Sequence, residues 1–349
     1  MEREDALPAI RRTVALSSLS HVIPLRLSGE GAFDALDRLC TAELYLRDGQ
    51  MLHTLLLDEE ARPFADLYAG RDDEAFVLLA EGPSKEVLLD HLRAHLPKDA
   101  GVTIEDLGAE HELLSLDGPW AWELMSELVG PEVVGLPYNN FFRPSDLIEG
   151  GLCFRAGKTG EFGYHLLVPR GEVAGVRARI EEAGRAFELG TADLDELDRC
   201  ALENWFFNIR REGRAGVTPL ELQLQWRVSR RKAFVGSEAL AARWSAGMKE
   251  RLTAFTSEAA VAVGDRVLFE GEAIGRVVNA AASVARGGHV GLALLDVHLA
   301  YPGIDRFSVE DRCPIRTVSP PFLDNRSLHV NPQEHSFRDR AALKFPPIG

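Results

Sequence analysis

The chain of 349 residues carries 39 lysines and arginines against 54 aspartates and glutamates, a formal net charge of −15 at pH 7. This excess of negative charge argues against a nucleic-acid-binding protein, whose binding domain is normally basic, and against attachment to anionic lipid by charge. Hydrophobic residues make up 46% and charged residues 27% of the chain, which is typical of a globular protein, and the length suggests two or three domains.

Three further features bear on the compartment and on metal binding. The sequence holds no run of about 18 uncharged apolar residues, so no transmembrane helix is expected. Residues 1–5 are too acidic for a signal or transit peptide. The cysteines form no Cys-x-x-Cys pair, so we expect small buried hydrophobic residues, no metal site and a cytoplasmic location. The four cysteines are Cys40, Cys153, Cys200 and Cys313.

The sequence of the first half of the chain predicts two similar series of strands and helices. A strand over residues 21–27 ends at a Ser-Gly-Glu-Gly turn, and the spacing of Phe33, Leu36 and Leu39 predicts a helix over 32–39. The order strand, helix, three strands, helix then repeats loosely. The remaining predicted strands are 51–57, 64–68, 75–79, 112–116, 152–155 and 164–168, and the remaining helices are 83–96, about 119–130, 171–184 and 193–207.

The stretch from 250 to 320 is rich in valine and glycine and differs from the rest of the chain. Short strands are predicted there at 252–255, 266–269, 273–278 and 289–295. Short strands at this spacing are typical of a small all-β barrel. The residues that follow Pro320-Pro321 are polar and contain further prolines, so we expect them to pack as an irregular arm.

The segment from Arg155 to Tyr164 carries the clearest chemical signal. Three glycines surround a single carboxylate, Glu161, between two predicted strands. Glycine permits a tight turn and a close approach of the backbone to a ligand. From the residues alone, a binding loop and a plain hairpin loop with a solvated glutamate both stay open. The fingerprints of dinucleotide binding, the P-loop, zinc proteases and serine hydrolases are missing from the sequence.

The same segment resembles the R-x-G-Y-T-G-E-x-G motif of the glycine-cleavage aminomethyltransferase (T-protein) family. Further stretches resemble landmarks of that family and occur in the same order over residues 15–322. They include Ser20-His21, Leu27-Ser28-Gly29, Phe64-Ala65-Asp66-Leu67, Leu202-Glu203, Thr218-Pro219-Leu220-Glu221, Leu224-Gln225-Trp226 and residues 234–240. One such motif would carry little weight, whereas the ordered series makes the resemblance specific.

The resemblance implies an α+β fold in which three domains surround a central tetrahydrofolate cavity, with a small C-terminal β-barrel. The expected first domain, which binds folate, joins residues 1–50 to residues 137–246. The second covers 51–136, the barrel covers 247–321, and an arm covers 322–349.

The resemblance also implies roles for individual residues. Asp66 matches the family's catalytic aspartate, which is expected to hydrogen-bond the reacting folate nitrogens and to stabilise positive charge. Glu161 matches a glutamate expected to accept paired hydrogen bonds from the pterin ring. The other expected folate-binding residues are Thr159, Gly160, Trp226 and, for the glutamate tail, Arg199. The expected substrate-binding residues are Tyr164, Trp205 and Phe206.

Several positions depart from the family pattern, and they decide which activity we expect. Lys158 replaces the motif tyrosine, Phe162 replaces an acidic residue, and Asn204 begins the replacement of an Ala-Gly pair. These changes favour a tetrahydrofolate-dependent transferase of the demethylase type, which moves a methyl group from a small molecule to folate N5. One alternative is aminomethyl transfer from a lipoyl carrier protein, docked by the arginine runs near 210–214 or 230–232. The other is a non-catalytic folate-binding protein.

Overall fold

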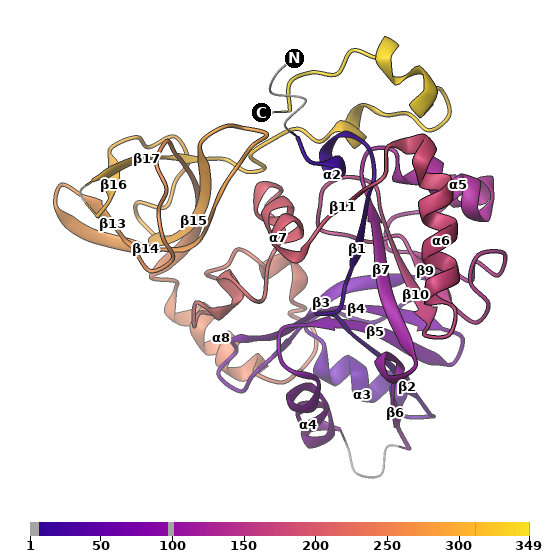
Figure 1. The fold of residues 1–349 in the computed structure, drawn as a ribbon. Coiled ribbons are helices and arrows are strands. Elements are labelled where there is room, and N and C mark those ends of the chain that lie inside the picture. The colour runs from indigo at the N-terminus through magenta and orange to yellow at the C-terminus, as the bar shows by residue number, and fades with distance from the viewer. Residues whose placement is uncertain (1–6, 97–100, 311, 349) are drawn as a thin grey trace.

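The computed structural model describes residues 7–96, 101–310 and 312–348, so residues 1–5, where we expect no leader, lie outside it. Two sheets, a closed barrel and a C-terminal arm make up this part of the chain (Figure 1). A short helix, α2 (Ala9–Arg12), precedes the first strand. None of the described helices is long and apolar enough to cross a membrane.

The first sheet has five antiparallel strands in the order β3-β4-β5-β2-β6. Its strands are β2 (Ile23–Ser28), β3 (Met51–Leu57), β4 (Pro63–Asp72), β5 (Ala75–Glu81) and β6 (Thr103–Asp106). Helices α3 (Ala32–Leu39) and α4 (Lys85–His95) pack on one face of this sheet. The apolar residues of these helices recur at helical spacing. Leu36 of α3 and Leu88 and Leu92 of α4 are therefore buried against the sheet.

The second sheet has six strands in the order β11-β1-β7-β10-β9-β8, in which the β1–β11 pair is parallel and the other pairs are antiparallel. Its strands are β1 (Ala15–Ser18), β7 (His111–Asp117), β8 (Phe141–Phe142), β9 (Leu152–Phe154), β10 (Gly163–Pro169) and β11 (Gly190–Thr191). Helices α5 (Ala121–Val129) and α6 (Val173–Gly184) cover its outer face, around a core that includes Trp120, Leu124 and Ile180.

The two sheets repeat one arrangement of elements. The chain order β2-α3-β3-β4-β5-α4-β6 recurs as β7-α5-β8-β9-β10-α6-β11. The order in space also corresponds, because β2 lies beside β5 as β7 lies beside β10, and β1 is an added strand between β7 and β11. The loose repeat predicted from the sequence is therefore confirmed, and the structure adds β6, β8 and β11 to it.

The two sheets pack on each other through the faces that their helices do not cover. Successive side chains of a strand point to opposite faces. Val77 and Leu79 of the first sheet therefore share one core with Leu113 and Leu167 of the second. The result is four layers, with helices outside and two sheets inside, and Figure 1 shows α3 and α4 on the far side of the first sheet from α5 and α6.

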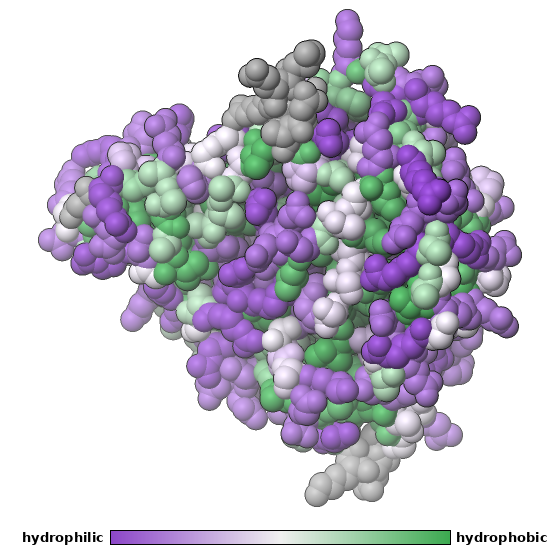
Figure 2. Space-filling view, in the orientation of Figure 1, coloured by the Kyte–Doolittle hydropathy of each residue, from purple (hydrophilic) through white to green (hydrophobic). Residues whose placement is uncertain are grey.

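The rest of the chain extends from this four-layer body. Helix α7 (Leu194–Glu203) begins at a capping box made by Asp193 and Glu196, and α8 (Ser237–Ala246) precedes the barrel. The barrel closes in the order β12-β15-β14-β13-β16-β17. Its strands are β12 (Glu250–Ser257), β13 (Arg266–Phe269), β14 (Glu272–Ala282), β15 (His289–Asp296), β16 (Phe307–Val309) and β17 (Cys313–Val318). Figure 2 shows a mostly hydrophilic surface over the barrel.

The arm that follows the barrel runs beside α2 at the top of Figure 1. It contains two of the seven short 3-10 helices of the described residues. These are η1 (Leu107–Ala109), η2 (Pro131–Gly135), η3 (Arg185–Phe187), η4 (Glu212–Arg214), η5 (Gln225–Arg227), η6 (Arg326–His329) and η7 (Phe337–Ala342). Phe337 of the arm is buried against Trp120, with ring centroids 5.8 Å apart. The arm is therefore part of the packed structure.

The predicted elements agree with the structure in most places and differ in a few. Helix 32–39 and strand 51–57 have the predicted ends. The strands and α-helices that were not predicted are β1, β6, β8, β11, β16, β17, α2 and α8. Sheet pairing also cuts across the expected domain boundaries, because β2 joins the first sheet and β7 joins the second. The boundaries at 50 and 136 ignored these long-range pairs, and the division into domains stays an interpretation. All four cysteines are free and buried, as expected.

Candidate functional site

A group of charged side chains lies between the two sheets. In β4, the residues Ala65, Leu67 and Ala69 point to the helix side, so Asp66 points toward the second sheet. In β10, Leu166 likewise lies in the outer core. His165 therefore faces the first sheet. The alternation of side chains along each strand thus brings polar residues of both sheets into one layer.

A cavity of about 50 Å³ opens within this layer. Its walls carry both acidic and basic side chains. The charged and polar residues among them include His21, Glu81, Asp117, Lys158, His165, Asp198 and Arg210. A space of this size holds one or two water molecules.

Lys158 joins two carboxylates beside the cavity. Asp66 and Glu81 are direct cross-strand neighbours of β4 and β5, and two like charges in that arrangement repel each other. The Lys158 ammonium lies 2.8 Å from Asp66 Oδ2 and 2.7 Å from Glu81 Oε1, and its side chain is 14% exposed. The replacement of the motif tyrosine by lysine therefore neutralises part of this negative charge.

Asp66 is fully buried and held by three basic side chains. His53 Nε2 lies 2.8 Å from its Oδ1, and Arg227 donates to the same oxygen. Burial alone would raise the pKa of Asp66, but Arg227, His53 and Lys158 together hold that pKa well below its ordinary value. The pKa of His53 falls to about 4 because of burial and the nearby Arg227. Asp66 is therefore ionised and His53 neutral at neutral pH.

Arg210 links the far side of the cavity to the same cluster. Its guanidinium pairs with both Glu81 and Asp198, and Asn208 donates to Asp198 at 2.8 Å. Burial opposes the charge on Glu81, but Lys158, with His21 and Arg210, lowers its pKa to about 2. The acids of this wall are thus charged and already paired.

Asp117 lies beneath the glycine-rich loop that follows β9. It accepts hydrogen bonds from Ser115 and from Thr159 Oγ1, the latter at 3.0 Å. A Cβ atom at Gly157 or Gly163 would lie 3.0 or 2.9 Å from Asp117 Oδ1, so these two positions need glycine. Burial raises the pKa of Asp117 to about 6, although both hydrogen bonds oppose the rise. Asp117 is thus a cavity residue that titrates near neutral pH.

His165 of β10 directly follows the glycine-rich segment and lines the cavity. Burial lowers its pKa to about 4, so the ring is neutral. Its Nδ1 atom is buried and has no hydrogen-bond partner among the described residues. A buried nitrogen without a partner is costly unless a ligand or water satisfies it. His165 therefore offers a hydrogen-bonding position that the protein itself does not use.

Glu161 does not line the cavity. Its side chain is fully buried and lies 3.3 Å from Arg11 Nη1. It also accepts hydrogen bonds from the backbone N–H of Ser327, at 2.9 Å, and from the Ser327 hydroxyl, at 2.6 Å. Gly160 lies against Asn204 and Asn325, where a Cβ atom would clash. This side of the loop binds the C-terminal arm, whereas Lys158 and Thr159 face the cavity.

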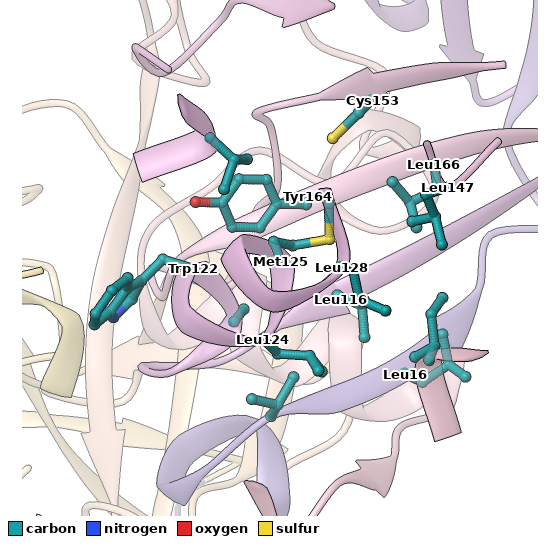
Figure 3. Packing of buried hydrophobic residues seen from close by; sticks show 14 of the residues in the cluster. Leu16, Leu116, Trp122, Leu124, Met125, Leu128, Leu147, Cys153, Tyr164 and Leu166 are labelled. Atoms are coloured by element: carbon teal, nitrogen blue, oxygen red, sulfur yellow. The ribbon is translucent and has the colours of Figure 1, made fainter. Parts of the chain in front are cut away.

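The aromatic residues expected to bind substrate lie in other places. Tyr164 alternates with His165 along β10 and is buried in the outer core, where Figure 3 shows its ring beside Met125. Trp205 packs beside another core that includes Phe207. Phe206 is partly buried and does not line the cavity. A strand sends adjacent residues to opposite faces, so Tyr164 points away from the cavity that His165 lines, and no contact supports its expected role.

Two expected folate-binding residues also lie away from the cavity. The Trp226 side chain is 73% exposed at the surface. Arg199 lines a different hollow, together with Leu7, Pro8 and Glu196. Adjacent residues of a helix point in different directions, so Arg199 does not share the cavity that Asp198 lines. Of the residues named for folate, the structure brings Thr159 to the cavity wall, and it brings Asp66 next to that wall through Lys158.

Sequence reasoning missed Glu81, Asp117 and His165. A partial signal was present, because Glu81 and Asp117 end their strands in register with apolar residues of the core between the sheets. Glu81 follows Val77 and Leu79 at steps of two, and Asp117 follows Leu113 and Ser115 in the same way. A polar residue in such a register points to the buried face of its sheet. Reading strand faces would have identified this set.

Comparison with known proteins identifies the family of the chain. The family described as GCVT N-terminal domain matches residues 3–232, which is more than half of the 349 residues. The chain belongs to this aminomethyltransferase family. An aminomethyltransferase of Rubrobacter xylanophilus is 29% identical over 321 residues, which cover 90% of this chain and 84% of that protein. An aminomethyltransferase of Shouchella clausii is 28% identical over 327 residues, with 90% and 88% covered.

The fold of the aminomethyltransferase family is also found in a solved structure. The glycine cleavage system aminomethyltransferase T from Bartonella henselae matches with a TM-score of 0.80, over 90% of this chain and 88% of that one. Its sequence is 21% identical, so this match concerns the fold. The α+β architecture with a C-terminal barrel and the transferase class expected from the sequence are both confirmed.

Proposed function

We propose that this chain transfers an aminomethyl group from a lipoyl carrier protein to tetrahydrofolate. The observation that carries the proposal is the buried, ionised carboxylate of Asp66, held beside a cavity between the two sheets. The relatives are named aminomethyltransferases, and they favour this activity over the methyl transfer from a small molecule expected from the sequence. We therefore interpret Lys158 and Phe162 as sequence differences among proteins that transfer aminomethyl groups.

The polar groups of the cavity suit a reduced pterin ring. Such a ring offers N–H donors and ring nitrogens along its edges, and it needs carboxylate and imidazole partners that are fixed in advance. Asp117 supplies a carboxyl group, and His165 supplies a nitrogen without a protein partner. Glu161 is not available for this role, because Arg11 and Ser327 already satisfy it. The pterin partner is thus reassigned from Glu161 to this pair.

The size of the cavity sets a condition on binding. About 50 Å³ is too small for a pterin ring, so side chains must move when folate enters. Lys158 projects into the space from a loop, and its long side chain is able to turn away from Glu81 while it keeps Asp66. Breaking a buried ion pair costs free energy that folate binding must offset. We therefore expect weaker binding than a preformed pocket would give.

Asp66 acts on the charge that forms during transfer. When an aminomethyl carbon leaves its sulfur, positive charge develops at the carbon and its nitrogen. A carboxylate that stays ionised in a closed site stabilises that charge more strongly than it would in water. His53 and Arg227 hold Asp66 in place before the reaction, so little reorganisation accompanies the step.

A carrier protein that is acidic would need a basic surface on this chain. The arginines near 210 do not provide it, because Arg210 lines the cavity and Arg211 pairs with Asp195 and Asp198. The run from 230 to 232 is the better candidate, since Arg230 stacks on the exposed Trp244 at 4.5 Å. Complementary charge at such a surface would speed the encounter with an acidic partner.

The experiment mixes the purified protein with tetrahydrofolate and an aminomethylated lipoyl carrier protein. We expect release of ammonia and formation of methylene-folate, both measured by mass spectrometry or coupled assay. A parallel arm supplies small methylated amines in place of the carrier. Methyl-folate from that arm alone would restore the demethylase interpretation. Folate binding without product in either arm would leave a non-catalytic folate-binding protein.

A further inference from the structure

We propose that Lys158 is a catalytic acid of this chain, which protonates the sulfur that leaves when the aminomethyl carbon is transferred. The inference rests on the proposed function and adds a residue to it. It follows from the position of the Lys158 ammonium between two buried carboxylates at the cavity wall, a position that the family motif assigns to tyrosine.

The geometry places this ammonium beside the reacting carbon. Lys158 Nζ is 2.8 Å from the Asp66 carboxylate, the group that stabilises the carbon in transfer. Lys158 also lines the cavity, and its side chain is 14% exposed, so bulk water has little access to it. A donor held against Asp66 therefore lies within reach of the Lys158 proton.

The surroundings keep this lysine protonated. Burial opposes the charge on Lys158, but Asp66 and Glu81 raise its pKa above the ordinary value. Other charged and titratable groups near the pair include Arg210, Arg227, His21, His53, His165, Asp117, Asp198 and Tyr138. The two arginines lie on the outer oxygens of the same carboxylates, and the pKa values of His21, His53 and His165 are lowered, mainly by burial. Lys158 is therefore a proton donor and not a nucleophile at neutral pH.

A fixed ammonium discriminates between classes of donor. If the leaving group departs as a neutral amine from a cationic centre, the positive charge of Lys158 opposes the reaction. If the leaving group departs as a thiolate, negative charge develops on sulfur and the same ammonium stabilises it. Lys158 and Asp66 form an ion pair whose two charges match the two ends of a breaking carbon–sulfur bond. This pairing favours a thioether-type donor.

The transfer step balances with Lys158 as the proton carrier. The carbon–sulfur bond breaks and its electron pair stays on sulfur, which takes a proton from Lys158 Nζ. The carbon forms a bond to folate N5, and the proton lost from N5 returns to the neutral Lys158 amine. The thiol is free, the carbon is on folate, and Lys158 is an ammonium again, without any oxidant or reductant.

The test compares single-turnover transfer from aminomethyl thioethers by wild-type protein and by Lys158→Met and Lys158→Arg. The donors are aminomethyl adducts of dihydrolipoamide and of a more acidic aryl thiol, with tetrahydrofolate as the acceptor. A general acid typically contributes about 10²–10⁴ in rate. We expect Lys158→Met to lose a factor of this size with dihydrolipoamide and much less with the aryl thiol. Lys158→Arg should not restore the rate, because an arginine keeps its proton.

Lys85→Met is the matched control, because Lys85 is a surface lysine paired with Asp106 and its side chain is 44% exposed. Circular dichroism and thermal unfolding of Lys158→Arg show whether the fold survives when the charge is kept. A full rate in Lys158→Met, or an equal loss for both thiols, would overturn the role as an acid. If Lys158→Arg restored the rate, the positive charge alone would explain the effect, and the role as a proton donor would be overturned. No transfer by the wild-type protein from either donor would instead count against the proposed function.

Discussion

At the scale of single residues, the site depends on how two neighbouring carboxylates are kept charged. Asp66 and Glu81 are paired across two strands, where like charges repel. The structure resolves the conflict by placing Lys158 between them and an arginine on each, Arg227 and Arg210. Removing one member therefore leaves charges of the other sign buried and unmatched, so we expect each substitution to affect stability as well as the proposed chemistry.

Asp66→Asn separates the two effects when it is compared with a second aspartate of β4. Loss of the Asp66 charge leaves Arg227 and Lys158 unmatched, and we expect the free energy of unfolding to fall by about 3–5 kcal/mol. The single-turnover rate should fall by about 10²–10³, as when one electrostatic stabiliser is removed. Urea unfolding and rapid-quench transfer assays measure the two quantities. Unchanged transfer in a folded variant would contradict the catalytic role.

Asp72→Asn is the control for that variant. Asp72 is also buried in β4 and pairs with two arginines, Arg26 and Arg143, but it does not line the cavity. Its loss should cost about 1.5–3 kcal/mol of stability, because its arginine partners are partly exposed. The transfer rate should stay near that of the wild type. If the transfer rate of Asp72→Asn fell as much as that of Asp66→Asn, any loss of charge in this strand would slow transfer, and the specific role of Asp66 would be contradicted.

Two other buried acids predict the pH dependence of stability. Burial raises the pKa of Asp117 from 3.8 to about 6 and that of Glu212 from 4.5 to about 7. Between about pH 4 and 7 the folded chain then binds more protons than the unfolded chain. The free energy of unfolding contributed by these groups therefore falls as the pH rises through this window, by roughly 2–3 kcal/mol for each group.

The double variant Asp117→Asn, Glu212→Gln removes both titrations. We expect the free energy of unfolding of the wild type minus that of the variant to fall as the pH rises from 4.5 to 7.5, measured by urea unfolding at several pH values. The buried histidines with lowered pKa values titrate in both proteins and cancel in this difference. Glu81 does not affect this comparison above pH 4.5. Its pKa in the folded chain is lowered to about 2, so the stability that it contributes is lost only as the pH falls from about 4.5 to 2. Parallel curves for the two proteins would rule out this assignment of the titrating groups.

At the scale of elements, the glycine-rich loop between β9 and β10 has two working sides. Lys158 and Thr159 face the cavity, and Glu161 faces the C-terminal arm. Glu161→Gln should weaken the attachment of the arm, because Arg11 loses a charged partner and Ser327 loses one acceptor. We expect faster amide hydrogen exchange over η6, by about 10- to 100-fold, with folate affinity little changed. Loss of folate affinity with unchanged exchange would return the pterin role to Glu161.

Much of the element order was predictable from the sequence, for local reasons. Leu36 and Leu39 recur at helical spacing, and α3 has the predicted ends because its pattern and its glycine-rich start agree. Strand β6 was not predicted, since its Thr-Ile-Glu-Asp sequence has no buried residue. It forms because β2 offers a free edge. Such pairings depend on residues far away in the chain and leave no local pattern.

The site was predictable only in part, and the reason lies in side-chain direction. The resemblance pointed to Asp66 and to the loop around Lys158 and Thr159, which the structure places at or beside the cavity. It did not reveal that Glu161 turns to the arm, because its partner Ser327 is 166 residues away. Tyr164 was chosen for its chemistry although strand alternation buries it, and the same alternation exposes His165 to the cavity. Distant contacts and strand register therefore explain what was missed.

At the scale of the whole molecule, one buried arginine joins the separate parts. Arg11 of α2 donates to the Thr159 carbonyl at 2.7 Å, to Glu203 of α7 at 2.7 Å and to Asn325 of the arm at 2.7 Å. Glu203 in turn accepts a hydrogen bond from Ser283 next to the barrel strand β14. Arg11 is fully buried, and its contacts tie the body, the loop, the arm and the barrel into one unit.

Arg11→Met is therefore expected to destabilise the whole molecule. Glu203 and Glu161 would keep their charges in a buried place without a cation, so the free energy of unfolding should fall by about 3–5 kcal/mol. Differential scanning calorimetry should also show a broader transition, because the barrel is less tightly coupled. Arg12→Met, at the next residue, should change stability by about 0.5 kcal/mol or less, because Arg12 is partly exposed and forms no ion pair with the described residues. Equal losses in both variants would refute the special role of Arg11.

The contact between Glu161 and Ser327 has a consequence for synthesis of the protein. A ribosome that adds about 5–20 residues per second needs roughly 10–30 s to make the 166 residues between them. During that interval the glycine-rich loop exists without the arm that holds one side of it, and Arg11 lacks Asn325. The nascent chain can therefore fold its two sheets but cannot yet finish the loop at the cavity. The side of the loop that carries Glu161 is therefore completed only after Ser327 has been made.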